Sequence, residues 1–219
     1  MISPADGFTL AIEASTYRGS VALLRGEEIM AARDVEMRGR EQERLMPAVA
    51  DCLTALAGGV NELDRVVCGA GPGSFTSLRI AASIAKGVCH ARGIPLYAVS
   101  SLALIVASSG MAGKAGRYVT WLEAMRGEAF AAVFDVASDG AVSAAGPVRI
   151  LMQSSLADAA REAGAARLDG EPTASAAALL LQTVLDAGPV DLAAWEPDYG
   201  RAAEAQVKWE AAHGRPLAW

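Results

Sequence analysis

Residues 69–88, which read GAGPGSFTSLRIAASIAKGV, are the stretch of sequence that decides the fold. They follow the short apolar run DRVVC at 64–68, which is typical of a buried strand, and they open a helix that we expect at 74–91. Free N–H groups and the helix dipole make the start of such a helix a candidate anion site. The stretch therefore predicts an α/β fold with a functional loop between a strand and a helix.

This turn matches neither of the two common phosphate-binding loops. A Walker loop ends in Gly-Lys-Ser/Thr, whereas the nearest lysine, Lys86, lies three turns into the helix. A dinucleotide fingerprint starting at Gly69 requires glycine at position 74, where this chain has serine. Two interpretations stay open: a tight turn in which Ser74 or Thr76 caps the helix, and a cap that also contacts a ligand or partner. The ligand candidates in the loop are Gly71, Gly73, Ser74, Phe75 and Thr76.

The elements around this stretch occur in the same order in both halves of the chain. Periodicity and turn residues predict three strands, a helix, a strand and a helix in each half. In the first half these lie at 8–14, 20–24, 28–35, 41–57, 64–68 and 74–91, followed by a strand at 95–99 and a connecting helix at 101–110. In the second half they lie at 118–123, 129–136, 141–150, 154–163, 166–168 and 173–187. Two such units predict two lobes that face a cleft, residues 1–110 and a smaller lobe of residues 111–219, divided within 108–116.

Composition excludes several classes of protein. The 219 residues are 53% hydrophobic and 20% charged, so the chain has ample material for a packed core and is not disordered. A net charge of −6 and 5% aromatic residues disfavour tight binding of DNA or RNA by the chain alone. Cys52, Cys68 and Cys89 each fall in an apolar stretch and are expected to be reduced core residues. The sequence shows no signal peptide and no apolar run long enough for a bilayer, so we expect a cytoplasmic protein.

Two carboxylates occupy comparable places in the two halves. Glu13 and Glu123 each end the first strand of their half, which predicts that both point into the cleft and are able to hold a divalent cation through water. A phosphate-binding hairpin also requires a glycine nearby, and this chain has Ser15 and Met125 at those places. Glu13 and Ser15 are therefore ligand candidates in a metal–nucleotide site that is incomplete.

Common catalytic and metal-binding patterns are absent from the sequence. His90 and His213 are the only histidines, and no cysteine or histidine pair has metal-ligand spacing. Cys89 and His90 are adjacent on a helix and so lie roughly 100° apart, which does not make a dyad. We expect no catalytic residue and no metal site.

The first and second helices carry more apolar residues than one face against a sheet requires. Small residues between the larger ones permit close approach of another helix, so we expect a partner surface there. The alternative is that the connecting helix at 101–110 covers the surplus face. The expected partner residues are Leu45, Val49, Leu53, Ile80, Ala81, Ile84 and Val88.

The stretch at 69–88 resembles the GxGPGSFTGLRIG signature of the TsaB (YeaZ) family, the accessory subunit of bacterial tRNA threonylcarbamoyladenosine synthesis. Further similarity lies at 11–16, 20–23, 44–47 and 94–101, and weaker similarity lies at 123–130 and 196–201. The resemblance implies a two-lobed actin-like (ASKHA, RNase H-like) α/β fold and a non-catalytic scaffold subunit. It also implies pairing through two helices with the catalytic paralogue TsaD, and a TsaE-like ATPase as a further partner.

The resemblance carries expectations about ligands as well. The complex uses ATP and Mg²⁺, so no cofactor is expected on this chain alone, and tRNA is expected to be met only through the complex. The protein is expected to be a homodimer when the paralogue is absent. A glycoprotease-like peptidase label also used for the family is not supported by the residues, which include no suitable nucleophile or metal ligands.

Four positions depart from the family pattern. Glu13 and Glu41 stand where aspartate and histidine are usual, Ser77 replaces a common glycine, and Met125 replaces an arginine. These departures weaken the case for ligand chemistry in the cleft. Two rival interpretations stay open: an actin-like small-molecule kinase or ATPase using Glu13 and Glu123, and a homodimeric regulator.

Overall fold

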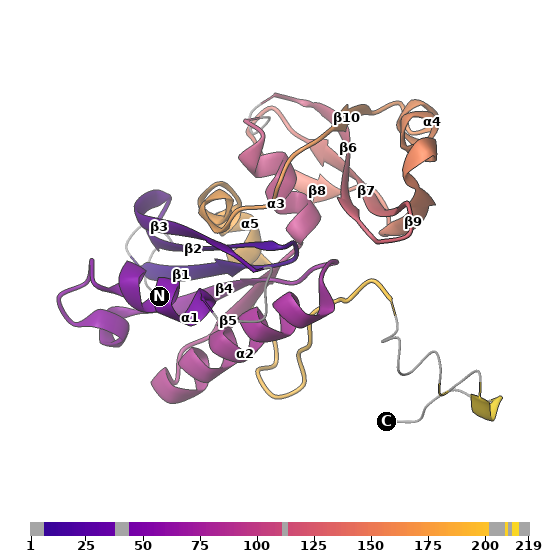
Figure 1. Cartoon of the computed structure of the whole chain (residues 1–219). Helices are drawn as coiled ribbons and strands as arrows, with labels where there is room; N and C mark the ends of the chain where they lie inside the picture. Colours follow the sequence, from indigo (N-terminus) through magenta and orange to yellow (C-terminus); the bar gives the residue numbers. More distant parts are fainter. Residues whose placement is uncertain (1–6, 38–43, 111–113, 202–208, 210–211, 215–219) are drawn as a thin grey trace.

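Five strands from the first half of the chain form one mixed sheet (Figure 1). The structure is a computed structural model, and it describes residues 7–37, 44–110, 114–201, 209 and 212–214. The strand order is β3-β2-β1-β4-β5, with β1, β2 and β3 antiparallel and β4 and β5 parallel to β1. The strands are β1 (Phe8–Glu13), β2 (Arg18–Arg25), β3 (Glu28–Glu36), β4 (Arg65–Gly69) and β5 (Leu96–Val99). Because β1, β2 and β4 are almost continuously buried, both faces of this sheet must be covered.

Helices cover the two faces of the first sheet in pairs. Helices α1 (Leu45–Leu53) and α2 (Phe75–Arg92) pack on one face, in a core that includes Leu10, Ile12 and Val66. Helices α3 (Ser101–Ser108) and α5 (Ala177–Asp186) belong to the core on the other face. The connecting helix α3 is therefore on the far side of the sheet from α2, and it does not cover the surplus apolar face of α2.

The second sheet is smaller and is built from the second half of the chain. Its order is β10-β6-β7-β8, and β9 also pairs with β7. The strands are β6 (Gly116–Glu123), β7 (Glu128–Val136), β8 (Val142–Ala144), β9 (Arg149–Met152) and β10 (Ala166–Leu168). Helix α4 (Leu156–Glu162) packs on one face of this sheet through Leu156 and Ala160. Short 3₁₀ turns lie at Gly59–Glu62, Gln153–Ser155 and Ala174–Ala176.

One core joins the two sheets. Helices α3 and α5 lie between them (Figure 1), and the apolar side chains around these helices come from β1, β2, β4, β6 and β7. The chain after residue 173 thus returns from the second sheet to the first. A division at residue 110 separates the sheets but not the packing, and residues 111–113 lie outside the described part of the chain.

Element types largely follow the sequence, with three differences. The strand expected at 141–150 is two strands, because Gly146 has a φ of 154° and Pro147 supplies no N–H for a ladder. The helix expected at 41–57 is α-helical only over Leu45–Leu53, and residues 41–43, including the departure at Glu41, lie outside the described residues. The helix expected at 173–187 begins as a 3₁₀ turn and is α-helical from Ala177.

The three cysteines are free and buried, as expected. Burial is the main cause that raises the pKa of the Cys89 thiol to about 11, and it raises the pKa of Cys68 as well. These thiols therefore stay protonated and act as core packing residues. Among the described helices, none combines the length and apolarity that a bilayer-crossing segment requires.

Candidate functional site

The loop between β4 and α2 is held closed by hydrogen bonds to three other segments. The N–H of Ala70 donates to the carbonyl oxygen of Val99 at 2.7 Å, and the N–H of Gly71 donates to Oγ of Ser101 at 3.1 Å. The N–H of Ser74 donates to the carbonyl oxygen of Ser15 at 2.7 Å. Because these donors already have partners in the protein, they do not form an open phosphate cradle.

The glycines of the loop are explained by close chain crossings. Gly71 has a φ of 87°, in the left-handed region, and a Cβ built there would overlap the carbonyl oxygen of Asp198. A Cβ built at Gly73 would overlap the carbonyl oxygen of Ser15. Ser74 is the N-cap by position, but its hydroxyl lies 3.1 Å from Oγ of Ser77 and accepts no N–H of the helix. The geometry supports a tight turn, but the expected side-chain cap by Ser74 or Thr76 is wrong, because neither hydroxyl accepts an N–H at the start of the helix.

Glu13 is fully buried beneath this loop. Its carboxylate accepts the N–H of Ser15 at 2.5 Å and the hydroxyl of Ser101 at 2.8 Å. Burial raises the pKa of Glu13 above its ordinary value, although the hydrogen bonds from Ser15 and Ser101 oppose that shift. The expectation that Glu13 points into the cleft is wrong, because the ends of β1 and β4 and the start of α3 enclose it.

The second carboxylate does not complete a metal site with Glu13. Glu123 is exposed at the end of β6, next to a turn in which Met125 has a φ of 66° and is 65% exposed. Within the described residues, no group of three or more His, Cys, Asp or Glu side chains is placed to hold a metal ion. Ser15 is likewise buried rather than open to a cleft, whereas Thr76 of the loop is exposed.

The structure divides the expected partner residues into two groups. Leu45, Val49 and Ala81 are fully buried, so their assignment to a partner surface is wrong. Helical periodicity identifies an apolar row, and on α1 that row faces β2 and the core of its own lobe. The remaining residues are half-buried at the outer side of that core: Leu53, Ile80, Ile84 and Val88.

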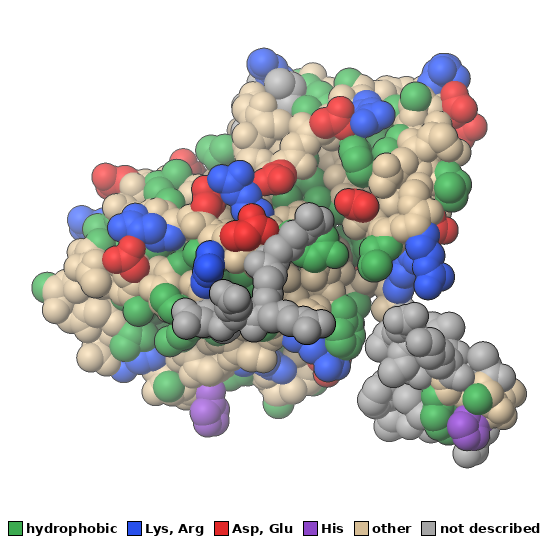
Figure 2. Space-filling view, viewed as in Figure 1, with side chains coloured by type: hydrophobic (Ala, Val, Ile, Leu, Met, Phe, Trp, Pro, Cys, Tyr) green, Lys and Arg blue, Asp and Glu red, His purple; other side chains and the backbone are tan. Residues whose placement is uncertain are grey.

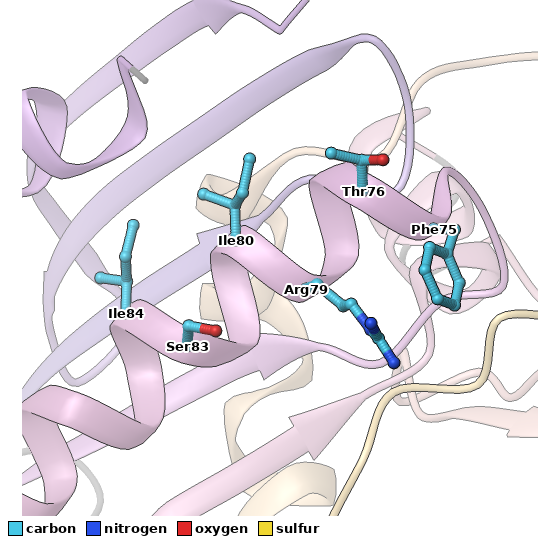
Figure 3. A pocket seen from close by; sticks show the side chains of 6 residues that line it. All are labelled: Phe75, Thr76, Arg79, Ile80, Ser83 and Ile84. Atoms are coloured by element: carbon cyan, nitrogen blue, oxygen red, sulfur yellow. The ribbon is translucent and has the colours of Figure 1, made fainter. Parts of the chain in front are cut away.

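An open groove runs along the outer side of α2. It has a volume of about 470 Å³ and is lined by Phe75, Thr76, Arg79, Ile80, Ser83 and Ile84. Figure 3 shows Ile80 and Ile84 on one side of the helix, while Phe75 and Arg79 extend from its first turns toward a neighbouring segment. The groove is therefore apolar along its length and aromatic and cationic at one end.

That neighbouring segment, residues 190–201, is called the strap below. Two backbone hydrogen bonds join it to the first lobe. The N–H of Val190 donates to the carbonyl oxygen of Leu96 at 2.9 Å, and the N–H of Asp198 donates to the carbonyl oxygen of Ala70 at 2.8 Å. Lys86 on α2 donates to the carbonyl oxygen of Trp195 at 2.7 Å. The strap thus lies against both α2 and the glycine loop.

The end of the strap reaches the second lobe. The ring of Tyr199 lies 4.5 Å from that of Phe75, while Arg201 forms an ion pair with Glu128 on β7. A Cβ at Gly200 would overlap the ring of Phe130, so the chain passes close to β7 there. The sequence did not predict that Tyr199, Gly200 and Arg201 lie at the site. The weaker similarity to the family at 196–201 was the signal that pointed to them.

Charges on the visible face of the molecule are mixed. Figure 2 shows Lys and Arg side chains interspersed with Asp and Glu side chains over both lobes, without a continuous basic area. Such a surface offers no extended track for a phosphate backbone on this face.

Two sheets of similar order, with helices packed between them, define a two-lobed actin-like α/β protein. The family model that matches residues 38–208 is described as "TsaD: tRNA N6-adenosine threonylcarbamoyltransferase". The chain therefore belongs to the TsaD family, and within it to the TsaB (YeaZ) group, as the resemblance at 69–88 predicted.

Individual relatives agree with this assignment. The TsaB protein of Bacillus subtilis is 35% identical over 99 residues, which is 45% of this chain and 43% of the relative. The TsaB protein of Escherichia coli is 30% identical over 131 residues, 60% of this chain and 56% of the relative. The solved structure of YeaZ from Pseudomonas aeruginosa has a TM-score of 0.74 at 25% identity and covers 88% of this chain and 99% of that one. The chain spans about half the length of the curated relatives that it matches.

Proposed function

We propose that this chain is a non-catalytic scaffold subunit in the biosynthesis of threonylcarbamoyladenosine in tRNA. Relatives from Bacillus subtilis and Escherichia coli are named as biosynthesis proteins of that modification. The observation that carries the proposal is the open apolar groove on α2, beside a glycine loop whose donors are already used within the chain. A closed loop next to an open helix face suits assembly better than chemistry.

The proposed partner is a TsaD-like catalytic paralogue, which docks two helices against α1 and α2. A TsaE-like ATPase joins the same complex, and the complex supplies the ATP, the Mg²⁺ and the contact with tRNA. In the absence of the paralogue, the chain pairs with a second copy of itself through the same face. The proposed site of action is the cytoplasm.

The rival kinase interpretation loses its main support. It needs Glu13 and Glu123 to converge on a cation, but Glu13 is buried and its oxygens accept hydrogen bonds from Ser15 and Ser101. The groove on α2 requires neither carboxylate.

Substitutions in the groove test the proposal. Ser83→Arg places a large charged side chain in the groove from an exposed position, and Ile84→Glu puts a carboxylate where a partner would bury it. Both are expected to weaken binding of the TsaD paralogue from the same organism at least tenfold, measured by sedimentation or calorimetry. The matched control is Leu179→Glu on α5, where the Leu179 side chain is 54% exposed. This variant is expected to bind the paralogue as the wild type does.

Circular dichroism establishes that each variant is folded. If folded Ser83→Arg and Ile84→Glu proteins bind the paralogue as tightly as the wild type, the contact is elsewhere and the proposal is wrong.

A further inference from the structure

The groove on α2 ends at a guanidinium that is held in place on two sides. The guanidinium carbon of Arg79 lies 4.2 Å from the ring centre of Phe75 and 5.6 Å from that of Tyr199. Its Nε also donates to the hydroxyl of Tyr199 at 3.4 Å. One ring belongs to the same helix and the other to the strap, so Arg79 is positioned by two elements that are far apart in sequence.

Arg79 has no carboxylate partner among the described residues. The ion pairs found there involve other arginines, and the acids of the strap make none with Arg79: Asp191, Glu196 and Asp198. Asp198 instead accepts the N–H of Gly200 at 2.7 Å. Arg79 therefore presents a preoriented charge with free donors at the rim of an apolar groove, an arrangement typical of binding hot spots.

The charged side chains of α2, which are Arg79, Lys86 and Arg92, are all basic. Lys86 donates to the strap, and Arg92 donates to the carbonyl oxygens of Val60 and Asn61 at 3.2 and 2.8 Å. Arg79 and His90 remain exposed, and α2 has no acidic residue to offset them. Packing α2 against the α2 of a second copy would bring like charges together.

Two acids on the elements next to α2 are already engaged. Asp51 on α1 forms an ion pair with Arg33, and Glu62 accepts the N–H of Gly58. A second copy would have to break one of these contacts in order to offer Asp51 or Glu62 to Arg79. Glu41 and Glu43 lie outside the described residues.

We infer that the groove selects a helix of a different protein, one that brings a carboxylate to Arg79 at the end of an apolar stripe. This inference rests on the proposed function. It adds the feature by which the groove distinguishes a helix of the paralogue from a second copy of this chain. The apolar residues Ile80 and Ile84 provide contact area that either partner can use. Arg79 favours an acidic helix and disfavours a second copy of this chain.

The test compares binding to the TsaD paralogue of the same organism with self-association of the chain alone. The variants are Arg79→Gln and Arg79→Glu. The control is Lys114→Glu, which makes the same change in charge as Arg79→Glu at an exposed residue just before β6. Calorimetry measures paralogue binding and sedimentation measures self-association, each at about 50 mM and about 500 mM NaCl, because salt screens exposed charges.

We expect Arg79→Gln to weaken paralogue binding about tenfold at low salt and Arg79→Glu to weaken it more, while Lys114→Glu binds as wild type. High salt is expected to weaken paralogue binding by the wild type. Self-association is expected to strengthen with salt and with Arg79→Gln, because both reduce repulsion between copies.

Three results separate this inference from the proposed function. If Ile84→Glu and Ser83→Arg abolish paralogue binding but Arg79→Glu does not change it, the groove is the interface and charge selection is wrong. Charge selection is also wrong if Arg79→Gln weakens self-association as much as it weakens paralogue binding. If the folded groove variants bind normally, the proposed function fails instead.

Discussion

At the scale of single residues, the glycine loop is shaped by chain crossings rather than by a ligand. Gly73 does not have a positive φ, yet it admits no side chain because the backbone of Ser15 passes directly over it. Gly87 on α2, by contrast, faces open space. We therefore expect substitution by alanine to change the free energy of unfolding in opposite directions at these two glycines.

We expect Gly73→Ala to lower the free energy of unfolding by about 2 kcal/mol, because the new Cβ must displace the Ser15 backbone. A loss of this size lowers the melting temperature by roughly 4–8 °C in a chain of this length. Gly87→Ala is expected to raise stability by about 0.5–1 kcal/mol, since alanine favours an exposed helix interior. Thermal and urea unfolding measure both. Equal stability of Gly73→Ala and wild type would contradict the crossing.

The buried Glu13 makes stability depend on pH. A carboxyl group whose pKa is higher in the folded chain than in the unfolded chain binds more protons when folded. Its contribution to stability is fully present below the unfolded pKa of about 4.3 and is lost as pH rises toward the raised folded value.

Glu13→Gln removes this titration while keeping an oxygen that can accept the N–H of Ser15. We expect the variant to gain stability relative to the wild type as pH rises from about 4.3 upward. Urea unfolding at a series of pH values measures the difference, with exposed Glu123→Gln as the control. Parallel stability curves for Glu13→Gln and wild type would show that Glu13 does not titrate in this way.

At the scale of elements, the strap adds a second connection between the lobes, besides the core around α3 and α5. It contacts α2 through Trp195 and Tyr199, and it contacts β7 through Arg201, whose partner Glu128 is only one-third exposed. An ion pair with partial burial is worth more than one in full solvent, because water competes less for its charges. The strap therefore has a measurable role in stability.

We expect Arg201→Ala to cost about 1.5–3 kcal/mol, because it leaves the partly buried Glu128 without its partner. The control is Arg161→Ala, which removes an exposed pair with Asp158 within α4 and is expected to change stability by less than about 0.5 kcal/mol. Urea unfolding gives both values, and hydrogen exchange should quicken in β7 of the Arg201 variant alone. If the two variants lose the same stability, the strap does not fasten the lobes.

At the scale of the whole molecule, helices α3 and α5 fill the space between the two sheets. In this arrangement the ends of β1 and β4 are covered by the glycine loop, α3 and the strap. The outer side of α2 is therefore exposed to solvent, whereas the ends of β1 and β4 are covered by other segments of the chain.

We expect the purified chain alone to show no ATPase, peptidase or tRNA-modifying turnover, because Glu13 and the loop donors at Gly71 and Ser74 are already engaged. Calorimetric titration with MgATP and a hydrolysis assay check this. Saturable micromolar binding with turnover that disappears in Glu123→Ala would support the kinase interpretation instead.

The sequence by itself determined the order of elements, the turn at 69–73 and the family, because these depend on local periodicity and on a specific motif. It also determined that α1 and α2 have apolar rows. It did not decide which row faces outward, since periodicity is the same whether a sheet or a partner covers it. Tertiary structure assigned Leu45 and Val49 to the core and left Ile84 at the groove.

Only the tertiary structure decided the surroundings of Glu13 and Arg79. Glu13 is buried because segments 88 residues apart meet at its carboxylate, and Arg79 is positioned by Tyr199, 120 residues away. Contacts at such separations leave no periodic signal in a single sequence. They arise when the strap and the core between the sheets bring distant segments to the same place.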